Sequence, residues 1–283
     1  MKNTKIGKFE CIPLSDGKFW LDGGAMFGVV PKVFWQKTNP SDDKNRILLG
    51  LHPLLIKHPD VNILIDTGIG DKFNDKLKTI YGVDRSETIE KSLDACGLKT
   101  EDIDIVINTH LHFDHSGGNT YYNEEREAVP KFPNAKYIIQ KKEWEVAINP
   151  NPRSKASYLK ENFLPLKSNN LLQLIDGDVE IFPDVKCILT GGHTEGHQIV
   201  IVENEGEGAI YWADLIPTTS HLRIPYIMGY DLFPLDVMKN KEKFIKLAIE
   251  KGWVSFFEHD PKYTSGTIIT ENNKPKFVPQ EVK

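Results

Sequence analysis

The stretch that most constrains this chain runs from Asn108 to Gly118, with the sequence NTHLHFDHSGG. It places three histidines and one aspartate within six residues, directly after a predicted strand. Neither a helix nor a strand needs this composition for packing, whereas imidazole nitrogens and carboxylate oxygens are ligands of zinc. Alternate residues of an extended chain face the same side, so His110 and His112 can bind one ion while Asp114 and His115 reach a second.

Further candidate ligands lie where other strands are expected to end. The predicted strands over 61–65, 185–189, 209–213 and 253–257 end just before Asp66, His193, Asp214 and His259. If the strands lie side by side, their ends converge at one edge of the packed sheets. The sequence therefore predicts one metal site assembled from segments far apart in the chain.

Composition narrows the class of protein. The 283 residues are 40% hydrophobic and 27% charged, as in an ordinary globular protein. The net charge of −5, without a long run of one sign, argues against a nucleic-acid groove or a polybasic membrane surface. No apolar run approaches the roughly 20 residues of a membrane helix, and the basic N-terminus is not followed by the apolar core of a signal peptide.

The three cysteines, Cys11, Cys96 and Cys187, are isolated and have no CxxC spacing. This usage is typical of reduced structural thiols and predicts a cytoplasmic protein.

Apolar periodicity and breaker residues predict alternating strands and helices. Strands are expected over 6–14, 51–56, 61–65, 103–107, 135–140, 185–189, 198–203, 209–213 and 253–257, and helices over 86–96, 141–148 and 236–250. The glycine-rich residues 22–31 and the aromatic residues 222–235 are expected to form loops. Short links between strands and helices favour a layered α/β architecture in a single domain over residues 1–283.

With these residues in place, the chain resembles the metallo-β-lactamase superfamily. The resemblance rests on the HxHxDH run, on Asp66 before it, and on His193, Asp214 and His259 after it, and it covers nearly the whole chain. Within the superfamily, the segments 21–32, 109–115 and 213–218 resemble the YtnP-type quorum-quenching lactonases.

The resemblance implies an α+β fold, a four-layer αββα sandwich of two mixed sheets flanked by helices. It implies that one divalent ion is held by His110, His112 and His193, and a second by Asp114, His115 and His259. Asp214 would bridge the two ions, and Asp66 would orient the ligands from behind. His197, in the segment GGHTEGH, matches a position that binds no metal and is expected to form structural hydrogen bonds.

Two ions roughly 3.5–4 Å apart activate a shared water for attack on a carbonyl carbon. Asp114 and Asp214 are therefore the expected catalytic carboxylates, and Asp114 is placed to carry a proton to the leaving oxygen. No serine or cysteine nucleophile is needed. A ligand set of nitrogen and oxygen without thiolate favours zinc, although manganese, iron or cobalt also suit it.

The sequence constrains the residues that hold the substrate less than it constrains the candidate metal ligands. Related acyl-homoserine lactonases carry a tyrosine three residues after the bridging aspartate, and this chain has Pro217 there. The polar contact is expected from His221, Tyr226 or Tyr230, and the apolar wall from Met26, Phe27 and Phe113. The aromatic residues 224–233 are equally consistent with a homodimer surface.

The leading hypothesis is a hydrolase that opens the lactone ring of N-acyl-homoserine lactones. The same metal pair also suits phosphotriesters, and a thioesterase of the glyoxalase II kind is a weaker alternative because no basic patch is evident. A nuclease is weaker still in an acidic chain. A metal-binding scaffold without activity is the alternative outside enzymes, although every ligand position is filled.

Overall fold

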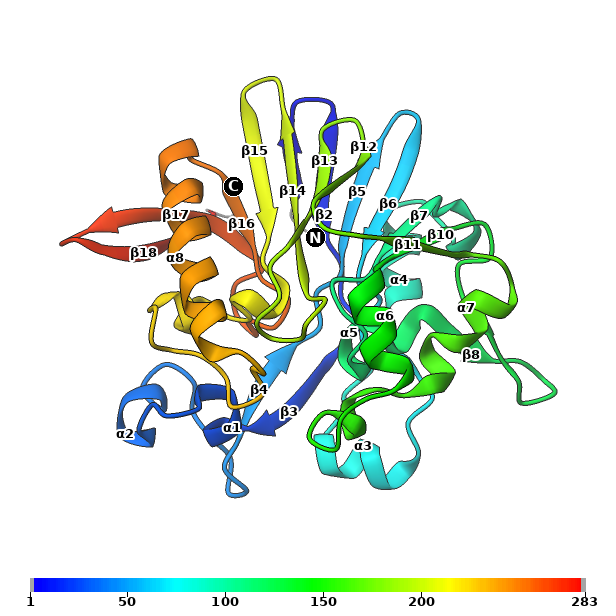
Figure 1. Ribbon diagram of the computed structural model, residues 1–283, viewed down its shortest axis with the longest axis horizontal. Helices are drawn as coiled ribbons and strands as arrows, with labels where there is room; N and C mark the ends of the chain where they lie inside the picture. Colours follow the sequence, from blue (N-terminus) through cyan, green and yellow to red (C-terminus); the bar gives the residue numbers. More distant parts are fainter. Residues whose placement is uncertain (1–2, 281–283) are drawn as a thin grey trace.

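The computed structural model describes residues 3–280 and contains two seven-stranded sheets packed face to face (Figure 1). The first sheet has the strand order β1 (Thr4–Ile6), β2 (Phe9–Pro13), β5 (Leu54–His58), β6 (Val61–Ile65), β7 (Ile105–Ile107), β10 (Lys136–Gln140), β11 (Leu172–Ile175). The second has the order β12 (Val179–Phe182), β13 (Val185–Leu189), β14 (Gln198–Asn204), β15 (Glu207–Tyr211), β16 (Val254–Phe256), β17 (Ser265–Glu271), β18 (Lys274–Pro279).

Two short hairpins and eight α-helices complete the described chain. The hairpins are β3 (Lys18–Asp22) with β4 (Arg46–Gly50) and β8 (Thr120–Tyr122) with β9 (Ala128–Pro130). The helices are α1 (Gly23–Phe27), α2 (Lys32–Trp35), α3 (Asp75–Tyr81), α4 (Ile89–Ala95), α5 (Phe113–Ser116), α6 (Lys141–Ile148), α7 (Leu164–Ser168) and α8 (Pro234–Lys251). No helix within residues 3–280 is both long enough and apolar enough to cross a membrane.

Three apolar clusters define the layers. The central cluster joins the facing sides of the two sheets, where Ile56 and Ile63 from the first meet Val200 and Tyr211 from the second. A second cluster packs α4 and α6 against the outer face of the first sheet, and a third packs α8 against the outer face of the second. The order helix, sheet, sheet, helix is the expected αββα sandwich, and the expected fold class is confirmed.

Strand direction explains why the candidate ligands meet. β6 and β7 are parallel neighbours in the first sheet, and β15 and β16 are parallel neighbours in the second. β13 runs in the same direction as β15, because each is antiparallel to the strand β14 between them. The carboxyl ends of these strands therefore emerge at one edge of the sandwich, with the loops after them close together.

Several element boundaries differ from the sequence expectation. Residues 6–14 form part of a β1–β2 hairpin instead of one strand, because Gly7 adopts a positive φ of 54° and turns the chain. The expected loop over 22–31 contains α1, whose first turn is capped when Asp22 Oδ1 accepts a hydrogen bond from Ala25 N (2.8 Å). The expected helix over 86–96 begins later, after the cap Thr88, and α8 begins at Pro234, before Asp236.

The central cluster gives a prediction about stability. Ile63 is fully buried between the sheets, so Ile63→Ala removes packed methyl groups and leaves a cavity. We expect it to lower the free energy of unfolding by about 2–5 kcal/mol, measured by denaturant titration. The control Ile269→Ala, at a side chain 41% exposed on β17, should cost less than about 1 kcal/mol. Equal losses in the two variants would contradict the assignment of the core.

Candidate dinuclear metal site

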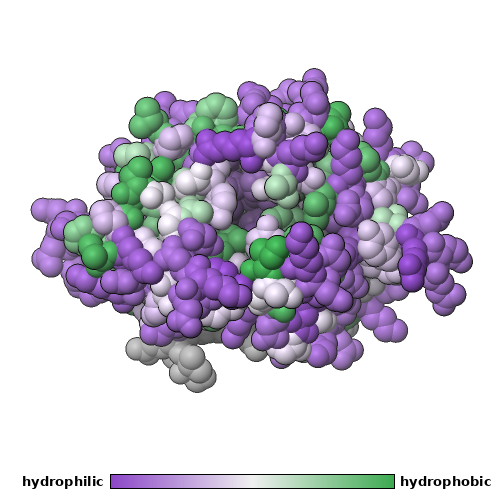
Figure 2. Space-filling view, turned by 90° about the horizontal axis from the view of Figure 1, so that it is seen from below, coloured by the Kyte–Doolittle hydropathy of each residue, from purple (hydrophilic) through white to green (hydrophobic). Residues whose placement is uncertain are grey.

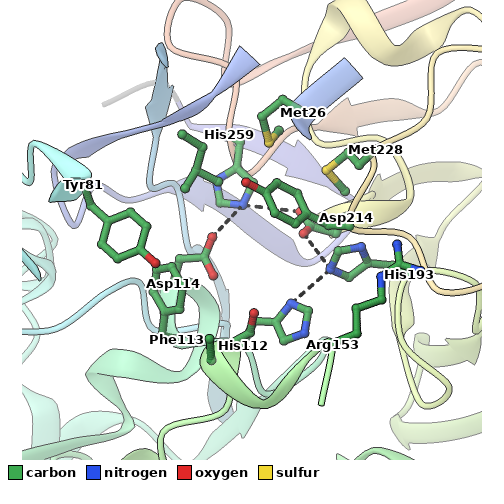
Figure 3. A pocket seen from close by; sticks show the side chains of 14 residues that line it. Met26, Tyr81, His112, Phe113, Asp114, Arg153, His193, Asp214, Met228 and His259 are labelled. Carbon is green, nitrogen blue, oxygen red and sulfur yellow. Dashed lines mark hydrogen bonds and ion pairs between the residues drawn. The ribbon is translucent and has the colours of Figure 1, made fainter. Parts of the chain in front are cut away.

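Seven side chains from both sheets converge at the shared strand edge. His110 and His112 follow β7, Asp114 and His115 lie on α5, His193 follows β13, Asp214 lies in the 3₁₀ turn Ala213–Leu215 after β15, and His259 follows β16. All seven are buried, with at most 8% of any residue exposed. Figure 3 shows five of them around one cavity.

The ligand atoms form two groups with Asp214 in contact with both. In the first, His193 Nε2 lies 3.1 Å from His112 Nδ1 and 3.1 Å from Asp214 Oδ2. In the second, His259 Nε2 lies 3.0 Å from His115 Nε2 and 3.3 Å from Asp214 Oδ1. Asp114 Oδ2 belongs to the second group, 3.7 Å from His259 Nε2.

This arrangement fits a pair of divalent cations. Ring nitrogens point at one another, and His110 Nε2 and Asp214 Oδ1 have no hydrogen-bond partner within the described chain although both are buried. Unpaired polar atoms in a protein interior are costly. Nitrogen and carboxylate donors around a cation satisfy all of these atoms at once, and they are the donor types that zinc-class ions take. The site is a dinuclear divalent metal site.

Burial and neighbouring charges shift the pKa values of the site residues in opposite directions. Burial lowers the pKa of His110, and its histidine neighbours lower it further. Burial also works against a charged His115, but Asp214 and Asp114 raise the pKa of His115 well above its ordinary value. Burial raises the pKa of Asp214, yet His115 and His193 hold it well below its ordinary value. A metal-free site therefore keeps protons on some histidines, and a cation must displace them to bind.

For three of the histidines, a hydrogen bond from outside the site fixes which ring nitrogen faces the site. His115 Nδ1 donates to Asp66 Oδ2 (3.0 Å), His193 Nδ1 donates to Asp231 Oδ1 (2.9 Å), and His259 Nδ1 donates to the Gly50 carbonyl (2.9 Å). Each bond leaves Nε2 free to bind a cation.

Asp66 forms further hydrogen bonds next to the site. Its carboxylate also accepts from Thr109 N (2.8 Å) and from Thr109 Oγ1 (2.7 Å), which holds the start of the histidine stretch. Asp66 has a φ of +56° and Ala213, just before Asp214, has a φ of +45°. Such angles are unfavourable for residues other than glycine and cluster at functional sites.

His197 lies behind the site with both ring nitrogens engaged. Its Nε2 accepts from Asp214 N (3.2 Å), and its Nδ1 bonds to Thr190 Oγ1 (2.7 Å). The structure thus gives it structural hydrogen bonds, in line with the expectation, and these bonds position the Asp214 backbone.

A cavity of about 200 Å³ opens onto the ligands. The space-filling view in Figure 2 shows a hollow with hydrophobic residues along parts of its rim. Of the side chains expected from the sequence to contact a substrate, Met26, Phe113 and Tyr230 line the cavity.

Phe27, His221 and Tyr226 do not line this cavity. His221 is only 1% exposed, and its ring donates to the Met26 carbonyl (2.8 Å) and bonds Thr218 Oγ1 (2.8 Å). Phe27 stacks on His221 with ring centroids 4.5 Å apart. Both rings support Met26 from behind, so the expectation that His221 offers a free polar contact is corrected. An aromatic-rich sequence does not reveal which of its rings face inward.

Six cavity residues and one supporting carboxylate were missed from the sequence. The cavity residues are Leu21, Tyr81 on α3, Arg153, Ala156 and Ser157 in the segment after α6, and Met228. The carboxylate is that of Asp231, which supports His193. Sequence spacing does not pair Asp231 with His193, because 38 positions separate them in the chain. The one sequence signal for Asp231 is its position just before the start of α8 at Pro234.

Comparison with known proteins agrees with this geometry. The family model described as "Metallo-beta-lactamase superfamily" matches residues 52–259. The chain belongs to this superfamily.

Among its relatives, an N-acyl homoserine lactonase of Bacillus cereus is 32% identical over 230 residues, which cover 76% of this chain and 83% of the relative. The crystal structure of a probable metal-dependent hydrolase from Staphylococcus aureus is 34% identical, with a TM-score of 0.91 over 99% of this chain and 100% of that one. AidC, a dizinc quorum-quenching lactonase solved with a product, shares the fold at 22% identity, with a TM-score of 0.81 over 100% of this chain and 98% of that one.

Asp231 provides a test of the site. Its Oδ1 accepts from His193 while its Oδ2 accepts from Met228 N (2.8 Å). Asparagine has one acceptor oxygen and can satisfy only one of these donors. We expect Asp231→Asn to weaken metal binding by about 10- to 100-fold, measured by titration of the metal-free protein with zinc. Asp236→Asn, at an exposed position in the first turn of α8, is the matched control, and equal affinities in the two variants would refute the role of Asp231.

Proposed function

We propose that this member of the metallo-β-lactamase superfamily is a metal-dependent hydrolase that opens the lactone ring of N-acyl-homoserine lactones. The observation that carries the proposal is the convergence of five imidazoles and two carboxylates below a partly apolar cavity. The lactonase names of its relatives support the choice of substrate. An apolar cavity over a polar centre suits an acyl chain attached to a small polar head.

In the proposed site, His110, His112 and His193 would hold the first ion, and Asp114, His115 and His259 would hold the second. Asp214 would contact both, because one of its oxygens faces His193 and the other faces His259. When bound, two such ions lower the pKa of a shared water and polarise a substrate carbonyl. Zinc is the proposed metal because the ligands are nitrogen and oxygen, with iron, manganese and cobalt as the other candidates.

The residues of the cavity then supply position and proton transfer. Asp114 lines the cavity beside the second group, so its carboxylate is placed to take the proton released as water adds to the carbonyl carbon and to pass it to the ring oxygen as the C–O bond breaks. Tyr230 also lines the cavity, and its hydroxyl has no partner within the described chain, which leaves it free to donate to the lactone carbonyl. Burial raises the pKa of Tyr230 and keeps the hydroxyl protonated. Pro217 fills the position of the related tyrosine, and its carbonyl accepts from His259 N (3.0 Å).

Quorum quenching is the biological role that follows from this substrate. A cytoplasmic location, a single domain over residues 1–283 and a homodimer in solution remain predictions from the sequence.

The substrate is tested with the zinc-loaded protein and a panel of N-acyl-homoserine lactones of increasing chain length, alongside paraoxon-type phosphotriesters. We expect lactone kcat/KM to exceed phosphotriester kcat/KM by at least about 100-fold, because the apolar cavity binds the acyl chain. Ring opening is followed by proton release, and phosphotriester cleavage by absorbance. Phosphotriester turnover above lactone turnover would reverse the proposal.

Asp214→Asn is the control for the metal mechanism in this panel. Loss of one charged bridging oxygen should abolish turnover of every substrate while the far-UV circular dichroism spectrum stays unchanged. Retained turnover would show that Asp214 does not bridge the ions.

A further inference from the structure

Arg153 is the one lysine or arginine among the side chains that line the cavity in the described part of the chain. It lies in a tight turn after α6, where Asn151 Oδ1 accepts from Arg153 N (2.9 Å) and Ser154 N (3.1 Å). Lys155 N also donates to the Asn151 carbonyl (3.0 Å). The turn therefore holds the backbone of Arg153 in place and directs its side chain toward the site (Figure 3).

One end of the guanidinium forms hydrogen bonds with the backbone of the cavity wall. Its Nη2 donates to the carbonyls of Gly229 and Asp231, the latter at 3.1 Å. These carbonyls belong to the segment that carries Met228 and Tyr230, so Arg153 joins the two loops on either side of the cavity.

The rest of the guanidinium is free. Arginine has five N–H donors, and neither Nε nor Nη1 of Arg153 has an acceptor among residues 3–280. The carboxylate of Asp231, whose backbone carbonyl accepts from Arg153, is already engaged by His193 Nδ1 and Met228 N. No ion pair with Arg153 occurs within the described residues, so its charge is not neutralised by the protein.

A free guanidinium beside a metal site favours an oxygen acceptor on the bound molecule. Figure 3 shows Arg153 next to His193, on the side of the cavity opposite Tyr81. A substrate whose scissile carbonyl lies over the ligands would place its next polar group in the cavity that Arg153 lines. In an N-acyl-homoserine lactone, that group is the amide carbonyl of the acyl chain.

We propose that Arg153 is a specificity-determining residue that donates from Nε or Nη1 to the amide carbonyl oxygen of an N-acyl-homoserine lactone. The proposal rests on the proposed function and deepens it, since it names the part of the substrate that the cavity recognises. It predicts a preference for lactones with an amide over lactones of the same ring and size without one.

Arg153→Lys separates substrate recognition from the structural bond between the loops. A lysine ammonium can reach the Gly229 and Asp231 carbonyls. It has no counterpart of the Nε and Nη1 donors that arginine offers to the cavity. The test compares N-hexanoyl-homoserine lactone with α-hexyl-γ-butyrolactone, which has the same ring and an alkyl chain in place of the amide. The zinc-loaded full chain is used throughout, and Lys155→Met, at an exposed position in the same turn, is the matched control.

We expect Arg153→Lys to raise KM for the amide substrate about 10- to 100-fold, the effect of losing a charge-assisted hydrogen bond. We expect the variant to keep KM for the alkyl lactone and kcat for both substrates within about twofold of wild type. Its melting temperature should stay within a few degrees of wild type. Lys155→Met should match wild type on both lactones. Arg153→Gln, which keeps a two-donor amide for the loop carbonyls, should reproduce the amide-specific loss if the lysine variant folds poorly.

Two results would overturn the proposal while leaving lactone hydrolysis intact. One is an unchanged KM for the amide substrate in both variants. The other is an equal loss on both lactones, which would assign Arg153 to the wall alone. Turnover of neither lactone by the wild-type protein would instead overturn the proposed function, and the recognition by Arg153 with it.

Discussion

The structure depends on how seven buried polar side chains, grouped at one edge of the sheets, satisfy their nitrogen and oxygen atoms. Five imidazoles and two carboxylates form overlapping groups whose ligand atoms lie within 4.8 Å of one another, and hydrogen bonds leave His110 Nε2 and Asp214 Oδ1 without a partner in the described chain. His259 Nε2 and His115 Nε2 face each other at 3.0 Å, and only one of them can donate. Two divalent cations would resolve this conflict, because nitrogen and carboxylate lone pairs that oppose one another can all bind to a cation.

Strand pairing brings those ligands together from distant parts of the chain. Parallel pairing of β6 with β7 brings Asp66 beside the histidine stretch, and parallel pairing of β15 with β16 brings Asp214 beside His259. The site thus requires both sheets to be assembled. Positive φ angles at Asp66 and Ala213 are tolerated because dense hydrogen bonding on each side fixes the backbone.

The substrate wall is coupled to the ligands through one carboxylate. Asp231 bonds His193 with one oxygen and the Met228 backbone with the other, while Arg153 bonds the Asp231 carbonyl. The first group of ligands and the wall that faces a substrate are therefore one connected unit. Lys241, buried on α8, extends this unit by donating to the carbonyls of Arg223 (2.9 Å) and Tyr226 (2.6 Å).

The sequence was sufficient to predict the fold class, and it indicated the seven candidate ligands that the structure brings together, because local sequence patterns carry both signals. The HxHxDH run is compact, and His193, Asp214 and His259 each follow a recognisable apolar strand. The pocket was less predictable because its contacts join distant segments. His221 and Met26 lie 195 positions apart, and only the folded chain shows that this histidine is already engaged.

Hairpins β3–β4 and β17–β18 were also missed. Their strands alternate weakly between buried and exposed residues, and β18 carries two prolines, so neither gives a clear strand pattern. Packing against the rest of the protein, more than local propensity, determines these elements.

The most direct test of this account is anomalous diffraction at the zinc absorption edge from crystals of the zinc-loaded protein. Two peaks are predicted, roughly 3.5–4 Å apart. One should be bordered by His110, His112 and His193, the other by Asp114, His115 and His259, with Asp214 in contact with both. A single peak, or peaks away from these residues, would contradict the central claim that the seven side chains form one dinuclear centre.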